Sequence, residues 1–369
     1  MTEVINQVKS MSRYIFQTSD EHVMAVSGPG SAAMEMAIAN LVFPKDEVLC
    51  VCNGYFSQRM AEMVRRVGGT TTIIEAAENA GIDSAAFEKA LQKKKYRVVT
   101  IAQGETSNTV CNYQLPQISS IAKKFGCIVI VDAVCTLSTM ELNMDAWGLD
   151  AVISGGQKGL ASIPGVSLLA FSKEAWDRIA ARKHPPSHWC FDALLADQFW
   201  NKGGYHYTAP VSGILALHEA LRLVCIETLE VRLMRHKQCS TALQFGLQAL
   251  GLKLLVNEPH RLNSVLGVKM PPGIDRDALR HHMSNIHKVE ISGSFGLNIV
   301  RIGQMGEQSR SHNLFRTLHS LGSSLSALGA KVDLPTGMAA LEHRLTLNQV
   351  GPQPEKTPRA AKEIALTAC

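Results

Sequence analysis

Three segments of this chain carry side chains that together could hold a charged, phosphorylated ring and react with it. Asp132 follows the apolar run Cys127–Val131, where a carboxylate is costly unless a cation or hydrogen bonds compensate for burial. Lys158 lies in a glycine-rich stretch, and a lysine amine can form a Schiff base with a carbonyl. Gly28-Pro29-Gly30-Ser31 opens a predicted helix, whose free N–H groups favour a phosphate. These three needs are those of pyridoxal phosphate.

Each motif alone also has a plainer interpretation. The segment from Gly28 to Ala33 matches the dinucleotide pattern G-x-G-x-x-A, but Asn53 rather than an acid ends the second predicted strand. The same segment could be a simple tight turn. Asp132 could accept hydrogen bonds from local N–H groups, and a single loop lysine is normally solvated. The combination therefore carries the hypothesis, and no single motif does.

The elements that must position these residues alternate along the first half of the chain. Short β-branched runs predict strands at His22–Ser27, Glu47–Cys52, Thr71–Glu75, Arg97–Ala102, Cys127–Val131, Ala151–Ser154 and Val166–Ala170. Helical patterns lie between most of them, at Ser31–Leu41, Ser57–Val67, Ser84–Lys93 and Gln117–Phe125. This alternation is typical of an α/β fold with a mainly parallel sheet, in which ligands bind beyond the carboxyl ends of the strands.

The second half of the chain has a different pattern. A long helix is predicted from Val211 to Leu250, and short strands follow at Ser264–Lys269, Lys288–Ser292 and Ile299–Ile302, before a helix at Asn313–Leu328. We therefore expect a large domain over residues 1–230, a smaller α+β domain over residues 231–335 and a flexible tail over residues 336–369.

Composition excludes several classes of protein. The 369 residues are 46% hydrophobic, and a scattered net charge of +5 does not favour nucleic-acid binding. No apolar run approaches the roughly 20 residues of a membrane span, so we expect no membrane partner. Nine cysteines without paired spacing argue against disulfides and against zinc, and favour a reducing, cytoplasmic setting with no bound metal.

Seven motifs occur in an order that resembles one family. They are SGPGSAAMEMAIANL, NGYFSQR, GETSNT, VDAV, SGGQKGLASIPG, YHYTAPV and RIGQMG. From about Val4 to Leu328 the chain resembles the class V aminotransferases of fold type I, most closely the alanine–glyoxylate and serine–pyruvate branch. The resemblance implies a fold type I transferase dependent on pyridoxal 5′-phosphate, with a seven-stranded, mainly parallel sheet and a smaller C-terminal domain. It also implies ping-pong transfer of an amino group from alanine or serine to glyoxylate or pyruvate.

The resemblance also implies roles for individual residues. Lys158 would form the Schiff base and then move the substrate proton, and Asp132 would keep the ring nitrogen protonated. Arg301 of RIGQMG would bind the substrate carboxylate through two parallel hydrogen bonds.

The remaining implied residues bind the cofactor. Gly30, Ser31 and Gln157 would contact the phosphate, Phe56 would stack on the ring, and Ser107 would lie at the polar edge of the ring. Tyr205 and Thr208 of YHYT would contact the phosphate of the partner subunit, which implies a homodimer with shared active sites.

Other members of the same fold remain as alternatives. Relatives carry a Gly-Pro-rich substrate segment and an N-terminal arm ahead of the region where this chain begins, so a cofactor-binding but inactive protein or a partner subunit is one possibility. Cysteine desulfurases place His where Gln157 stands, and pyridoxamine–pyruvate enzymes use a second Arg that residues 292–296 lack. The ureidoglycine–glyoxylate branch stays open.

Overall fold

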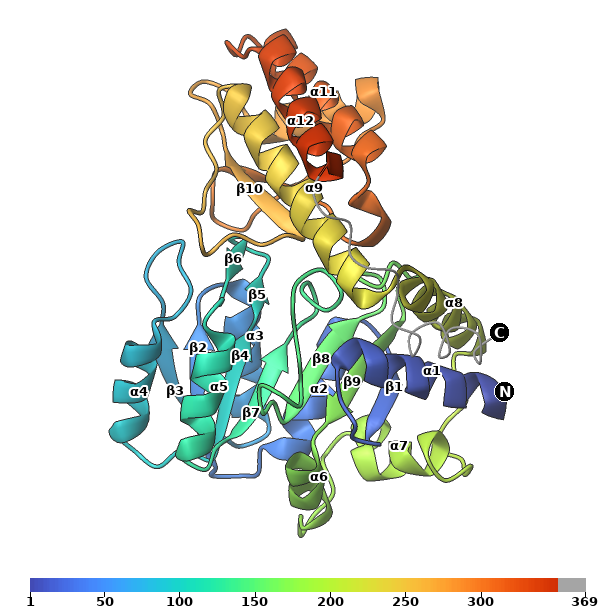
Figure 1. The fold of residues 1–369 in the computed structure, drawn as a ribbon. Coiled ribbons are helices and arrows are strands. Elements are labelled where there is room, and N and C mark those ends of the chain that lie inside the picture. Colours follow the sequence, from blue (N-terminus) through green and yellow to red (C-terminus); the bar gives the residue numbers. More distant parts are fainter. Residues whose placement is uncertain (351–369) are drawn as a thin grey trace.

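A seven-stranded sheet forms the centre of the larger domain (Figure 1). The computed structural model describes residues 1–350, and side chains as far as residue 347. In spatial order the strands are β1 (Val23–Ser27), β9 (Val166–Phe171), β8 (Ala151–Gly155), β7 (Ile128–Asp132), β4 (Val98–Ala102), β2 (Glu47–Cys52) and β3 (Thr70–Glu75). Only β9 runs against its neighbours in this sheet, which confirms the predicted mainly parallel α/β architecture.

Helices cover both faces of this sheet, and this explains why its inner strands are continuous apolar runs. Every residue of β4, β7, β8 and β9 is buried. The chain moves along the sheet in one direction through α2 (Gly30–Leu41) and α3 (Tyr55–Arg66), and back through α4 (Ser84–Gln92) and α5 (Leu115–Lys124). Because such crossovers are right-handed, α2 and α3 lie on one face and α4 and α5 on the other (Figure 1).

The carboxyl ends of β1, β2, β4, β7 and β8 meet at one edge of the sheet, since these strands run parallel. A short hairpin, β5 (Gly104–Glu105) with β6 (Val110–Cys111), rises from this edge toward the smaller domain (Figure 1). The hairpin was not predicted, because two-residue strands leave no periodic pattern. This edge is where the chemical motifs gather.

The smaller domain contains an antiparallel sheet in the order β10 (Val265–Lys269), β12 (Ile299–Gly303) and β11 (Ser292–Gly293). Its other elements are α9 (Leu229–Ala249), α10 (Arg276–His282), α11 (Ser311–Ala327) and α12 (Leu334–Val350). The strand predicted at Lys288–Ser292 is wrong apart from Ser292. Residues Met283–His287 instead form a π-helical turn, and Lys288 takes a left-handed conformation with φ of 54°.

Helices differ from prediction at four further places. The predicted helix from Val211 to Leu250 is two helices, α8 (Val211–Glu227) and α9, because Thr228 has φ of 68° and breaks the helical path. We did not predict α1 (Thr2–Phe16), α6 (Lys173–Ala180) or α7 (Ala193–Trp200). In the part of the chain that the structure describes, no helix is both long and apolar enough to span a bilayer.

The tail predicted from residue 336 is wrong over its first part. Residues 334–350 form α12, which packs on α9 and α11, and the remainder of the predicted tail lies outside the described residues. Leu341 of α12 is fully buried in the core of the smaller domain. The hydrophobic cores of the two domains separate between Cys225 and Cys239, whereas the domain limits at residues 230 and 335 stay predictions.

If α12 is part of the smaller domain's core, Leu341→Ala should lower the free energy of unfolding by about 2 to 4 kcal/mol, because it leaves a cavity. Leu347 on the same helix is 49% exposed and provides the matched control. Urea denaturation of both variants measures the difference. Equal, small losses from Leu341→Ala and Leu347→Ala would contradict the packing of α12.

Candidate active site

A cavity of about 190 Å³ opens at the carboxyl edge of the large sheet. It is lined by six of the residues proposed from sequence, Gly30, Ser31, Phe56, Asp132, Gln157 and Lys158, together with Pro29, Met34, Gly104, Thr106, Val134 and Cys135. The structure thus brings together residues that are more than 120 positions apart in the chain. Ser107, Tyr205, Thr208 and Arg301 do not line this cavity.

Asp132 is a buried carboxylate at the end of β7 and is 4% exposed. Its Oδ1 accepts a hydrogen bond from the Val134 N–H at 2.8 Å. The pKa of Asp132 is raised to about 7, chiefly by burial and also by the charge of Glu105, while the Val134 N–H and the charges of Lys158 and Arg59 act in the opposite direction. No cation of the described residues forms an ion pair with Asp132. A protonated ring nitrogen in the cavity would supply the missing partner.

The start of α2 provides an anion site. Its first turn has no side-chain cap, so backbone N–H groups and the helix dipole remain available. A Cβ at Gly30 would come within 2.8 Å of Val134, so only glycine fits without displacement. Arg59 donates from Nη1 to Ser31 Oγ at 2.7 Å and brings a positive charge to the same place. A phosphate fits this donor set, and sequence reasoning missed Arg59.

Lys158 projects from a tight loop that follows β8. Lys158 N donates to Gly155 O at 3.1 Å, and Ala161 N donates to Lys158 O at 3.0 Å. Gly159 has no room for a side chain, since a Cβ there would lie 2.2 Å from Leu137 O. Gln157 Oε1 is buried in this cavity without a hydrogen-bond partner. The loop therefore presents an amine and an unused amide to a ligand.

Glu105 organises the opposite wall of the cavity, although sequence reasoning assigned it no role. Its fully buried carboxylate accepts hydrogen bonds from the N–H groups of Phe56, Ser57 and Ser107, and from Ser107 Oγ at 2.7 Å. The carboxylate also lies at the start of α3, where the helix dipole stabilises a negative charge. The sequence signal that could have identified Glu105 is an acidic residue in the motif GETSNT directly after a buried strand. A buried carboxylate there needs hydrogen-bond donors close by.

These hydrogen bonds position Phe56 and Ser107. Phe56 lines the cavity, with the Arg59 guanidinium 5.0 Å from the centre of its ring. Ser107 Oγ accepts from Tyr55 N and donates to Glu105, so its hydroxyl is engaged beside the cavity. Ser107 itself does not line the cavity, whereas the preceding residue, Thr106, does.

Arg301 connects the smaller domain to this wall. From β12, its Nη1 donates to Thr106 O at 2.6 Å and its Nε donates to Gly293 O at 2.7 Å. Burial lowers the pKa of Arg301, and Glu105 opposes that effect. The adjoining loop adds a stack of Phe295 on Tyr55, with ring centres 4.7 Å apart. Arg301 is therefore held next to a cavity-lining residue.

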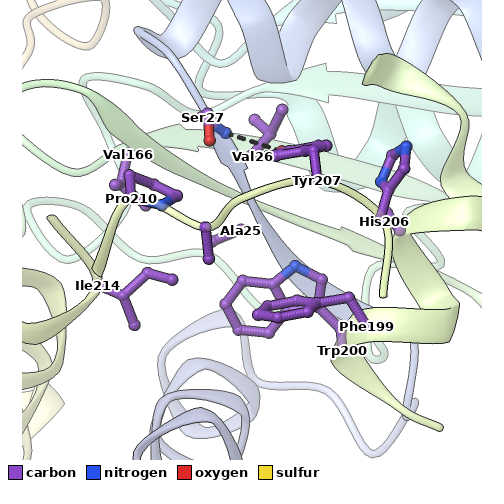
Figure 2. Close-up of a pocket in the computed structure, with 12 residues that line it drawn as sticks. Ala25, Val26, Ser27, Val166, Phe199, Trp200, His206, Tyr207, Pro210 and Ile214 are labelled. Atoms are coloured by element: carbon purple, nitrogen blue, oxygen red, sulfur yellow. Dashed lines mark hydrogen bonds between the residues drawn. The ribbon is translucent and has the colours of Figure 1, made fainter. Parts of the chain in front are cut away.

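Tyr205 and Thr208 lie on an exposed segment that does not line the cavity. Tyr205 is 74% exposed, and its hydroxyl lies 3.4 Å from Thr208 Oγ1. The intervening residues anchor the segment: His206 Nε2 lies 3.1 Å from Trp189 O, and the Tyr207 hydroxyl accepts from Ser27 N. Figure 2 shows the hydrogen bond between Ser27 and Tyr207 beside β1, in a small pocket that His206 also lines. Tyr205 and Thr208, which the sequence predicts to contact a partner subunit, are thus exposed on the surface of this subunit.

Comparison with known proteins agrees with this geometry. Residues 1–300 match the family model described as Aminotransferase class-V. The alanine–glyoxylate aminotransferase of Drosophila melanogaster is 34% identical over 342 residues, which cover 90% of this chain and 87% of that protein.

Solved structures agree as well. The ureidoglycine–glyoxylate aminotransferase of Bacillus subtilis superposes with a TM-score of 0.91 at 30% identity, covering 94% of this chain and 90% of that one. The alanine–glyoxylate aminotransferase of Nostoc sp. gives a TM-score of 0.86 at 32% identity, covering 88% and 87%.

Fold and site together define a pyridoxal phosphate-dependent transferase of fold type I. The chain belongs to the class V aminotransferase family and is an aminotransferase. The residues present fit the cofactor: Asp132 suits a ring cation, the start of α2 suits a phosphate, and Lys158 suits a carbonyl. Across residues 1–350, no cluster of three potential metal ligands occurs.

The raised pKa of Asp132 predicts an effect on stability in cofactor-free protein. Ionisation of buried Asp132 lowers the free energy of unfolding. This loss is absent below the ordinary pKa of 3.8, grows as the pH rises, and reaches its full size above about pH 7. Asp132→Asn removes this loss. At pH 8 the cofactor-free variant should be more stable than the parent by up to about 4 kcal/mol, and near pH 4 the two should be equal. Urea unfolding at both pH values measures this, and a pH-independent difference would contradict it.

Proposed function

We propose that this enzyme transfers the amino group of alanine or serine to glyoxylate or pyruvate by a ping-pong mechanism. The observation that carries the proposal is that Lys158 and Asp132 line one cavity, while Arg301 donates a hydrogen bond to the backbone of Thr106, which lines the same cavity. The alanine–glyoxylate aminotransferases similar to this chain support the choice of substrates.

Each residue has a distinct task in this reaction. When bound, pyridoxal phosphate supplies an electron sink for the substrate Cα–H bond. The carboxylate of Asp132 would bind the proton-bearing ring nitrogen, whose positive charge favours the ionised form of this buried acid. Lys158 Nζ holds the cofactor, and after substrate binding it takes the Cα proton as a general base. Gly30, Ser31 and Arg59 hold the phosphate against the helix start.

Arg301 binds the substrate carboxylate in this proposal. Its Nε and Nη1 each donate one N–H to a backbone carbonyl, which leaves the second N–H of Nη1 and both N–H groups of Nη2 for a substrate carboxylate. The bonds to Gly293 and Thr106 orient the group before substrate arrives, which lowers the entropic cost of binding. A small α-amino acid then places its Cα between Arg301 and Lys158.

A second candidate substrate is (S)-ureidoglycine with glyoxylate as acceptor. The similarity to the Bacillus subtilis enzyme, at a TM-score of 0.91, favours this candidate. Both candidates use the same cavity residues and differ only in the side chain of the donor.

The test is a donor panel with the purified, cofactor-loaded protein. L-alanine or L-serine with glyoxylate should yield glycine and the matching keto acid, and (S)-ureidoglycine is assayed in parallel. Lys158→Ala should lower kcat by at least about 10³-fold, because the variant loses the base and the covalent attachment. Full turnover by Lys158→Ala, or turnover only with ureidoglycine, would contradict the proposed function.

We also propose a homodimer in which Tyr205 and Thr208 contact the phosphate in the partner's site. Their exposure beside the anchored residues His206 and Tyr207 supports this arrangement. All eight cysteines in the described residues are free thiols, which supports the proposed cytoplasmic setting.

Shared sites predict complementation between two defective chains. A subunit with Lys158→Ala has an inactive site of its own but intact Tyr205 and Thr208. A subunit with Tyr205→Phe and Thr208→Val retains Lys158 but lacks the phosphate contacts that it would give its partner. Co-expression with different affinity tags should yield mixed dimers more active than either parent. Mixed dimers no more active than the parents would contradict the shared site.

A further inference from the structure

A buried charge cluster lies between the loop that carries Lys158 and the smaller domain. Arg232, in the first turns of α9, is only 2% exposed and is the largest fully buried side chain among the described residues. Its Nη1 pairs with Glu227 Oε2 at 2.8 Å, and its Nη2 donates to Gly159 O at 2.6 Å. Gly159 is the residue after Lys158, so Arg232 holds the backbone of the catalytic loop directly.

Neighbouring residues of α9 hold a second segment, which follows Arg301 in the chain. Arg235 pairs with the same Glu227 and donates from Nη1 to Gly306 O and Ser309 O. His236 donates from Nδ1 to Arg232 O and accepts the Gly306 N–H at Nε2. Burial lowers the pKa of His236 to about 3, so the ring stays neutral and both hydrogen bonds persist at physiological pH.

The two segments also touch each other directly. Gly306 has φ of 60°, and a Cβ there would lie 2.7 Å from the Ala161 Cβ. The Lys158 loop and the segment after Arg301 are therefore in close contact at Ala161 and Gly306. Both segments are also hydrogen-bonded to the first turns of α9. A shift of one segment displaces the other unless the Glu227–Arg232–Arg235 cluster breaks.

The geometry points to Arg232 as a positioning residue for Lys158, which fixes the amine of the large domain relative to Arg301 of the smaller domain. Arg232 touches neither cavity nor substrate, so it acts through Gly159. This inference rests on the proposed role of Lys158 as the base. A proton transfer depends steeply on the distance between base and carbon, and small misplacements are costly.

The chain offers a matched control for the loss of a buried arginine. Arg178 has a side chain only 9% exposed, pairs with Asp46 and donates to Leu41 O, far from the loop that carries Lys158. Arg232→Met and Arg178→Met each remove one buried guanidinium from its carboxylate partners, which are Glu227 and Glu307 for Arg232 and Asp46 for Arg178. Both should lose stability, but only Arg232→Met should affect the catalytic loop.

Two measurements separate positioning from simple destabilisation. In cofactor-free protein, amide hydrogen exchange over residues 156–163 should rise about tenfold in Arg232→Met and stay at the parent rate in Arg178→Met. In the loaded enzyme, kcat should fall about tenfold or more in Arg232→Met, with KM for the amino donor changed far less. Equal effects of both variants on exchange or on kcat would overturn the inference.

A third variant keeps the test decisive if Arg232→Met does not fold. Arg232→Lys retains the charge beside Glu227, but one ammonium cannot reproduce the fork that reaches both Glu227 and Gly159. It should fold, show faster exchange over residues 156–163 and have a reduced kcat. Parent-like exchange and kcat in Arg232→Lys would also overturn the inference. Exchange is measured without substrate, so a failed donor panel leaves this arm of the test intact.

Discussion

A carboxylate at the end of a buried strand imposes the constraint on which this structure depends. β7 is buried throughout because helices cover both faces of the sheet, and Asp132 ends it inside the protein. One backbone N–H does not compensate for that burial, and the pKa of about 7 is the measure of the deficit. A ligand with a cationic ring nitrogen removes the deficit, so the fold itself creates the preference for such a ligand.

The start of α2 and the loop after β8 form the rest of the site. The start of α2 suits the anionic end of such a ligand, and the loop carries the amine of Lys158. The uncapped start of α2, with Ser31 and Arg59, favours an anion, while a glycine-rich loop presents Lys158 across the cavity. Both parts contain polar groups without a hydrogen-bond partner in the protein, namely Gln157 Oε1 in the loop and the first N–H groups of α2. These groups are available to a ligand. The site therefore has a negative end at Asp132 and a positive end at the start of α2, and the sheet fixes the distance between them.

In the proposed function, placement of the substrate requires the second domain. Arg301 reaches Thr106 O from β12, and the α9 cluster bonds both the Lys158 loop and the segment after Arg301. Arg301 and Lys158, the proposed carboxylate anchor and base, therefore come from different domains, and the α9 cluster bonds the segments that adjoin both of them. This arrangement explains why a buried ion cluster, which adds little net stability, lies between the domains.

The sequence predicted those features that leave a local pattern. Apolar runs located the strands of the large sheet, and the residues at strand ends, together with the resemblance to class V aminotransferases, identified six residues of the cavity. Arg59 and Arg232 were missed because their roles arise from partners 28 and 73 positions away, which no local spacing reveals. Glu105 was missed because its donors on Phe56 and Ser57 lie 48 or 49 positions away. The helix α12 was missed because its burial depends on packing against α9. Tertiary contacts, rather than local propensity, decide such elements.

The protonation state of the cofactor ring tests the central claim most directly. Pyridoxal phosphate labelled with ¹⁵N at the ring nitrogen can be bound to the protein at pH 8 and observed by NMR. Asp132 should hold the nitrogen protonated, so the resonance should have the chemical shift of a pyridinium ion and lose it in Asp132→Asn. A neutral pyridine shift in the parent protein would contradict the claim that Asp132 creates this site.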